Sequence, residues 1–205
     1  MSSQIRDQTK PERGRPRGFE EKTVLDGLTD TFWRKGFADA SLDDLSQATG
    51  AARASLYKFY GDKADLLVVA LDHYAERFDL RVQAAITDNE TARKALHQVL
   101  RASAERLTDT AAPPGCLRCR TTLEMSQVDP RIDAAIARAN HAFTLNMARL
   151  LAMDADLTEP PRPLSQDAAF LTAIVNGMVV SAAAGADRAT LYAIVDTAIG
   201  AITTA

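Results

Sequence analysis

The run from Ser41 to Tyr60, SLDDLSQATGAARASLYKFY, constrains the fold of this chain more than any other stretch. Ser41 and Asp44 have the spacing of a capping box, in which each side chain accepts a hydrogen bond from the main-chain N–H of the other and a helix begins. Gly50 follows where a left-handed residue ends that helix. A second short helix then has Leu56 and Tyr60 on one face. We therefore predict two short helices joined by a tight turn.

This arrangement is the helix-turn-helix motif, whose second helix enters the major groove of DNA. The apolar face of the second helix leaves several polar side chains to point elsewhere. These are Arg53, Ser55, Tyr57 and Lys58. The motif therefore predicts a segment that binds double-stranded DNA.

The sequence around the motif resembles a known family. The matching segments are FWRKGF at 32–37, SLDDLSQATG at 41–50 and ASLYKFYGDKADLL at 54–67. The run from Val24 to Leu67 closely resembles the N-terminal domain of the TetR family of bacterial repressors. Two residues depart from the family pattern. Ala52 stands where Ser or Thr is usual, so the recognition helix lacks its usual side-chain cap, and Tyr60 stands where Phe is usual.

The resemblance implies which side chains contact DNA. On or near the groove-facing side of the recognition helix it places Arg53, Ala54, Ser55, Tyr57 and Lys58, which contact base edges and phosphates. Ser41 is expected to contact DNA through its hydroxyl and main-chain N–H. Lys63 is expected to face the DNA backbone at the positive end of the following helix. The alternative for Lys63 is a solvated surface side chain.

Residues 1–18 are expected to form a flexible basic arm, because they contain Pro and Gly and few apolar residues. The formal net charge of the 205-residue chain is −3, yet cations predominate in this segment. The tetrapeptide Arg13-Gly14-Arg15-Pro16 resembles the core of an AT-hook, which is thin enough for the minor groove. We therefore expect Arg13 and Arg15 to bind the minor groove. The alternative is a tail that only aids solubility.

The rest of the chain is predicted to be helical, because its apolar segments are long and have the helical period. Together with the two helices of the motif, this makes nine expected helices. The other seven span about 19–35, 62–86, 91–108, 117–128, 130–153, 165–184 and 188–203. Ser165 is expected to cap the eighth helix. The fold class is all-α. We expect a helix-turn-helix domain at 19–66 and a six-helix effector-binding and dimerisation domain at 67–205.

The last two helices are expected to form a homodimer. They contain FLTAIVNGMVVSAAAG and LYAIVDTAIGAI, and helices apolar on most faces must be buried. Small residues allow close approach, so two helices from each subunit can form a four-helix bundle across a two-fold axis. The alternative is burial within one subunit. We favour the dimer because a helix-turn-helix protein gains affinity and specificity from two half-sites.

The resemblance also implies an effector pocket among the fourth to eighth helices, where a small molecule alters the spacing of the two DNA-binding domains. The candidates for this pocket are Tyr74, Phe78, His97, Arg101, Cys116, Met125, His141, Phe143 and Asn176. Each of them has the alternative of an ordinary core or surface residue.

The segment Gly115-Cys116-Leu117-Arg118-Cys119-Arg120 offers a different chemistry. Cys116 is expected at a helix N-terminus near two arginines, an environment that lowers the pKa of a thiol. Cys119 lies one turn further and could act as a resolving thiol, so a redox or electrophile sensor is one interpretation. Packing as small hydrophobic side chains is the interpretation we favour. Metal binding is the weakest, since no His cluster is adjacent.

Other classes of protein fit less well. We find no metalloprotease, phosphate-loop or serine-hydrolase motif, so a helical enzyme is a competing hypothesis without a catalytic constellation. A helical scaffold leaves the motif and the basic arm unexplained. No secretory signal and no apolar run of 18 residues is present. We therefore expect a cytoplasmic transcriptional regulator that is not an enzyme and has no cofactor or membrane partner. A repressor is the expected type, and an activator is the alternative.

Overall fold

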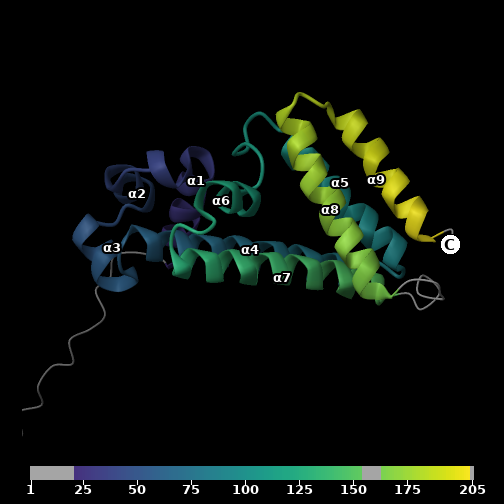
Figure 1. The fold of residues 1–205 in the computed structure, drawn as a ribbon, viewed down its shortest axis with the longest axis horizontal. Coiled ribbons are helices and arrows are strands. Elements are labelled where there is room, and N and C mark those ends of the chain that lie inside the picture. Colours follow the sequence, from purple (N-terminus) through teal and green to yellow (C-terminus); the bar gives the residue numbers. More distant parts are fainter. Residues whose placement is uncertain (1–20, 154–162, 204–205) are drawn as a thin grey trace, which may run out of the picture.

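The computed structural model describes residues 21–153 and 163–203, and these residues form α-helices joined by turns and loops (Figure 1). The first helices are α1 (Glu21–Asp39), α2 (Leu42–Thr49), α3 (Arg53–Tyr60) and α4 (Lys63–Asp88). They are followed by α5 (Ala92–Leu107), α6 (Leu117–Met125), α7 (Pro130–Leu151), α8 (Leu164–Ala183) and α9 (Arg188–Thr203). The predicted all-α class is confirmed, since the described residues contain no strand.

The N-terminal module consists of α1, α2 and α3 around one apolar core. Leu28 and Phe32 lie four residues apart on α1 and are fully buried. Leu45 of α2 and Leu56 of α3 are also buried, with at most 1% of their surface exposed. Helical spacing therefore brings one face of each short helix into the same core. The predicted end of α1 at Gly36 is a kink (φ 79°, ψ 178°), after which the helix continues to Asp39.

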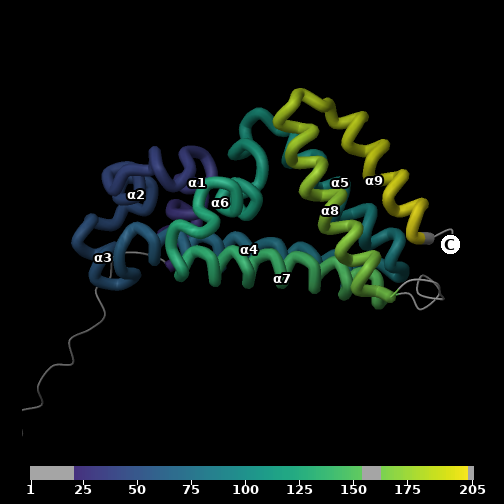
Figure 2. Tube along the Cα trace, viewed as in Figure 1, coloured from purple at the N-terminus to yellow at the C-terminus, as the bar shows by residue number. Residues whose placement is uncertain are grey.

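The helix α4 connects this module to the rest of the molecule. Its first half contributes Leu66, Leu67 and Leu71 to the N-terminal core, while Val82 and Ala85 belong to the C-terminal core. The tube in Figure 2 shows α7 running alongside α4 over much of its length. The N-terminal core also contains side chains of α6 and α7, including Leu117 and Ile132. A boundary after residue 66 therefore stays a prediction.

The C-terminal core is formed mainly by α5, α7, α8 and α9 with the second half of α4. Helices α8 and α9 contact each other, and α9 lies at the outer edge in Figure 1. The expected cap of α8 was wrong: the helix begins at Leu164, after Pro163, and has no side-chain cap. Helix α6 is shorter than expected, because the main chain leaves it at Ser126 and Gln127 has a positive φ of 65°.

Helix α8 is long and apolar enough to cross a membrane by length and composition alone, with a mean hydropathy of 1.2 over an 18-residue window. Only 28% of that window is buried in the subunit. The exposed residues of this helix include the small or apolar side chains Ala169, Ala173 and Val180.

Candidate DNA-binding surface and internal cavity

The first helix of the motif begins as the sequence predicts. Ser41 Oγ accepts a hydrogen bond from the Asp44 N–H over 3.1 Å, and Asp44 Oδ2 accepts one from the Ser41 N–H over 2.9 Å. The hydrogen bond from Lys35, with those from Ser41, lowers the pKa of Asp44 to about 2. Gly50 ends the helix in the left-handed region, with φ 67°. The capping box and the glycine turn are both present.

The recognition helix α3 presents a polar surface on one side and Leu56 to the core on the other. Ala52 precedes it with an extended backbone and makes no side-chain cap, as predicted. Arg53, Ala54 and Lys58 are exposed, Tyr57 is 41% exposed and Ser55 is half-buried. Arg53 forms an ion pair with Asp43 of α2, so the two helices of the motif are also joined on their outer side.

An aromatic side chain on this surface was missed by the sequence analysis. Phe59 is 66% exposed, next to Tyr57 and Lys58. Helical spacing gave no signal for this, because Phe59 lies three residues after Leu56, a separation that usually places two side chains on the same face. A large apolar group on an exposed recognition helix is suited to contact with thymine methyl groups or sugars.

Lys63 has protein partners on the side where DNA is expected. Its ammonium lies 4.7 Å from the centre of the Phe37 ring and 3.4 Å from the Ala38 carbonyl oxygen. At the start of α4 the N–H groups of Ala64 and Asp65 donate to the side chain of Asp62. Arg13 and Arg15 lie outside the described residues.

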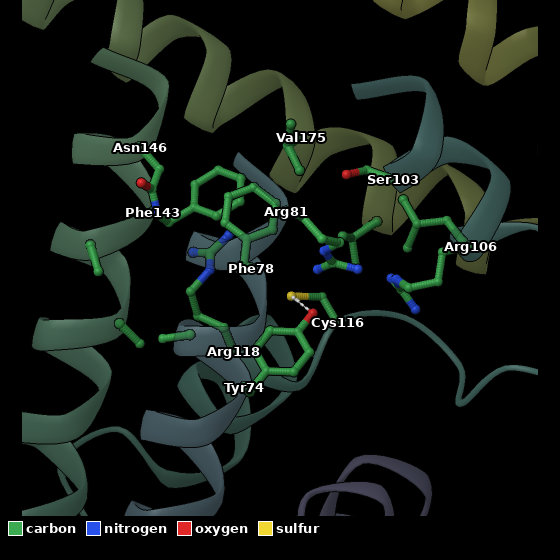
Figure 3. Close-up of a pocket in the computed structure, with 15 residues that line it drawn as sticks. Tyr74, Phe78, Arg81, Ser103, Arg106, Cys116, Arg118, Phe143, Asn146 and Val175 are labelled. Carbon is green, nitrogen blue, oxygen red and sulfur yellow. Dashed lines mark hydrogen bonds between the residues drawn. The ribbon is translucent and has the colours of Figure 1, made fainter. Parts of the chain in front are cut away.

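A cavity of about 40 Å³ lies in the C-terminal half, where α4, α5, α6, α7 and α8 converge (Figure 3). Four of the predicted pocket residues line it: Tyr74, Phe78, Cys116 and Phe143. Phe78 and Phe143 are stacked with their ring centres 4.7 Å apart. The cavity therefore has an aromatic wall between α4 and α7.

The other five predicted pocket residues lie outside this cavity. His97 and Arg101 face α9, where both approach Asp196, at 3.5 and 2.8 Å. Met125 is buried in the N-terminal core, and His141 is exposed on α7. Asn176 lies behind the cavity wall and accepts hydrogen bonds from Arg118 and Cys119.

Five polar lining residues were missed by the sequence analysis: Arg81, Ser103, Arg106, Arg118 and Asn146. Arg81 could have been found, because it continues the stripe of Tyr74 and Phe78 at helical spacing on α4. Arg106 and Arg118 reach the cavity from α5 and α6, and their convergence depends on how these helices pack.

The two cysteines take part in a hydrogen-bonded group at the cavity wall. Tyr74 donates from its hydroxyl to Cys116 Sγ over 3.3 Å, and Cys119 Sγ donates to Asn176 Oδ1 over 3.4 Å. Hydrogen bonding from Cys119, the Arg118 charge and the Tyr74 hydroxyl lower the pKa of Cys116, against the effect of burial. Both cysteines are free, and the described residues contain no cluster of three metal-ligating side chains.

Helix α6 joins the cavity to the N-terminal module. Arg118 faces the cavity, while Arg120, about 200° further around the helix, faces α1. Arg120 donates to the carbonyl oxygens of Trp33, Arg34 and Lys35 over 2.9 to 3.2 Å. Glu124 accepts from the Phe37 N–H over 3.1 Å.

This architecture, a capped helix-turn-helix on a helical domain with an internal cavity, defines a DNA-binding transcriptional regulator. Comparison with known proteins agrees. A sequence model described as "Bacterial regulatory proteins, tetR family" matches residues 24–70. The HTH-type transcriptional repressor ComR of Escherichia coli (strain K12) is 30% identical over 194 residues, covering 93% of this chain and 92% of ComR. The chain therefore belongs to the TetR family of bacterial regulatory proteins.

Two further similarities extend over most of the chain. The uncharacterized HTH-type transcriptional regulator YezE of Bacillus subtilis (strain 168) is 27% identical over 171 residues, covering 78% of this chain and 88% of YezE. A cysteine mutant of the TetR family regulator CifR, solved with 26bp double-strand operator DNA, is 28% identical with a TM-score of 0.74. The match covers 92% of this chain and 99% of the CifR chain.

Proposed function

We propose that this protein is a cytoplasmic, non-enzymatic repressor that binds a palindromic operator as a homodimer and is released by a small molecule bound in the cavity. The observation that supports this most is the placement of α6. One face of this short helix lines the cavity and the other holds the end of α1. Binding in the cavity is thereby linked to the position of the DNA-binding module.

The proposed DNA contacts come from the outer face of α3. Its N-terminal residues Arg53, Ala54 and Ser55 would meet base edges, while Tyr57 and Lys58 would hold phosphates. Ser41 donates both its hydroxyl and its main-chain N–H to Asp44 Oδ2, so a contact with a phosphate would require one of these donors to turn from the carboxylate to the DNA. In this proposal Arg13 and Arg15 add a minor-groove contact and Lys63 a phosphate contact.

The proposed dimer interface is the outer face of α8 with α9. Exposed small and apolar residues repeat along α8 as Ala169, Ala173, Gly177 and Val180. A Cβ added to Gly177 would meet no atom within 4 Å, so the space beside this glycine is open in the subunit. A second copy of the same face could approach closely there, as an isologous interface requires.

The proposed switch is a shift of α6 against α1. Arg120 and Glu124 bind main-chain groups on both sides of Gly36, and a Cβ at Gly36 would lie 2.6 to 2.8 Å from their side chains. Trp33 adds a second link, since its Nε1 donates to the Pro114 carbonyl oxygen over 3.1 Å. A differential interaction of about 1–3 kcal/mol would change operator affinity 5–150-fold.

We do not favour the thiol-sensing alternative. Cys116 is only 9% exposed, and both sulfur atoms have hydrogen-bond partners inside the protein. Reagents in solution react best with exposed thiolates. The contacts of both cysteines support a structural role at the cavity wall.

The proposal is tested by selecting DNA from a random-sequence pool with the purified full-length protein. We expect enrichment of an inverted repeat whose half-sites are about 34–36 Å apart or a multiple of this, as for other two-fold symmetric readers. The Tyr57→Ala variant, compared with Arg138→Ala on the distant surface of α7, should bind the selected DNA more weakly. A pool that shows no enriched sequence would contradict the proposal.

A further inference from the structure

The cavity carries an unbalanced positive charge. Three of its lining side chains are arginines, Arg81, Arg106 and Arg118, and no Asp or Glu is among the lining residues that the structure describes. Figure 3 shows Arg81 and Arg106 on one side of Cys116 and Arg118 on the other side, where its guanidinium lies 4.5 Å from the centre of the Phe143 ring. A thiolate at Cys116 would offset one of these charges, so cations remain in excess.

Arg118 is the most deeply placed of the three, at 4% exposure. Its terminal nitrogens donate to Asn140 Oδ1 and Asn176 Oδ1 over 2.5 and 2.6 Å. Both acceptors are neutral amides, and its buried Nε has no hydrogen-bond partner. A buried cation is costly unless an anion compensates it, so Arg118 is prepared for a negatively charged ligand.

Arg81 also lacks an anionic partner, although unlike Arg118 it is exposed to solvent over much of its surface. In the described residues it forms no hydrogen bond or carboxylate ion pair, and it lies 5.3 Å over the ring of Phe78. Desolvation of its inner side beside the cavity lowers the pKa of Arg81, Tyr74 acts in the opposite direction, and the nearby cation Arg106 lowers the pKa further. Arg106 itself donates only to the carbonyl oxygens of Pro113 and Gly115, over 3.4 and 2.6 Å.

The remaining walls are apolar. The stacked rings of Phe78 and Phe143 form one side, and Val175 and Val179 of α8 form another. A volume of about 40 Å³ holds roughly three water molecules. A ligand that fits without rearrangement therefore has few heavy atoms, a negative end and a hydrocarbon body.

We propose that the cavity binds a small organic carboxylate, with its carboxylate between Arg81 and Arg118 and its hydrocarbon part against Phe78 and Phe143. This inference rests on the proposed function, because it names the chemical class of the effector. Arginine suits this role, since its planar donors match the two oxygens of a carboxylate. The apolar walls favour a carboxylate over an inorganic anion, which has no hydrocarbon part to bury.

The inference is tested by calorimetric titration of the full-length protein at pH 7.5 with propionate and benzoate, each against its neutral amide, propionamide or benzamide. The acid and amide of each pair have similar shapes and differ in charge. We expect at least one acid to bind ten times or more tighter than its amide, and tighter than sulfate. Equal affinity of acid and amide, or sulfate binding as tight as either acid, would overturn the inference.

Substitutions locate the site. Arg81→Gln should weaken binding of the acid at least fivefold and leave amide binding unchanged. The matched control is Arg77→Gln, one turn earlier on α4, where the arginine approaches Asp26 at 3.5 Å and does not line the cavity. Unchanged acid affinity in Arg81→Gln, or an equal loss in the control, would place the anion elsewhere and overturn the inference. Arg118→Lys keeps a cation for Asn140 and Asn176 and serves as a second, less disruptive probe, with the same expected loss.

Operator binding separates this inference from the proposed function. If the acids bind in the cavity but leave the affinity for selected DNA unchanged, the carboxylate site stands and the effector role fails. If the protein binds DNA and neither acid binds to it, the carboxylate inference fails and the DNA-binding role stands.

Discussion

Arg120 donates a hydrogen bond from Nη2 to the main-chain carbonyl oxygen of Lys35 over 2.9 Å, and so joins α6 to the end of α1. The kink at Gly36 interrupts the helix, and the main-chain carbonyl groups just before it accept hydrogen bonds from the guanidinium of Arg120. Arg120 is at the same time held by Glu124 at 2.6 Å. The joint therefore connects α6 to α1 through several directed contacts, and we propose it as the route by which a shift at the cavity reaches the DNA-binding module.

Removing this joint should weaken both stability and regulation. We expect Arg120→Met to lower the free energy of unfolding by about 1–3 kcal/mol, because three hydrogen bonds from a charged donor are lost at a partly exposed site. Urea denaturation at fixed protein concentration measures this. The control Arg138→Met breaks an exposed pair with Asp72 and should cost less than about 1 kcal/mol. Equal losses in the two variants would argue against a special role for the joint.

The recognition helix should gain stability from the cap that it lacks. Ala52 already has an extended backbone, with φ −62° and ψ 142°, so a Ser at this position can bond to the N–H groups of the first turn. We expect Ala52→Ser to stabilise the protein by about 1 kcal/mol in thermal or urea unfolding. Ala54→Ser, an exposed substitution inside the same helix, is the control and should not stabilise. A loss of stability in Ala52→Ser would show that the first turn is held by other means.

Local sequence signals were enough to predict the motif but not the cavity. The pair Ser41 and Asp44 and the turn at Gly50 act within a few residues, so their geometry follows from spacing alone. The charge of the cavity depends instead on Arg106 and Arg118, which come together only when α5 and α6 pack against α4. For the same reason His97 and Arg101 were predicted to line the pocket, although both side chains approach Asp196 of α9 instead.

Phosphate contacts from α3 should be visible in the dependence of operator binding on salt. We expect Lys58→Ala to reduce the slope of log affinity against log salt concentration by about 1, because one released counterion is lost. Lys63→Ala should change the slope less if its ammonium stays with Phe37 and the Ala38 carbonyl. Fluorescence anisotropy on labelled operator DNA between low and moderate salt measures both. A full change of slope in Lys63→Ala would show that this lysine leaves its protein partners on DNA.

The capping box should make stability depend on pH in the acid range. The pKa of Asp44 is about 2 in the folded protein, below its ordinary value of 3.8, because Lys35 and Ser41 bind its carboxylate form. Its contribution is therefore complete above pH 4 or so and is lost as the pH falls through about 2. We expect Asp44→Asn to flatten the pH dependence of unfolding across this window.

The matched control for Asp44 is Asp39→Asn, since Asp39 is exposed and has no hydrogen bond or ion pair among the described residues. Its pH dependence should follow that of the unsubstituted protein. Circular dichroism in urea at a series of pH values measures the three curves. If Asp44→Asn leaves the curve unchanged between pH 4 and 2, the capping box makes no contribution that depends on the charge of Asp44.

The outer face of α8 should determine the oligomeric state. We expect Ala173→Arg to convert the proposed dimer to a monomer near the chain mass of 22.2 kDa, because a large cation would stand in the middle of a closely approached apolar face. Operator affinity should fall with it, since each subunit would reach only one half-site. Analytical ultracentrifugation reports the mass, and Ala137→Arg on the exposed side of α7 controls for the added charge. A dimer that survives Ala173→Arg with its operator affinity intact would place the interface on another surface.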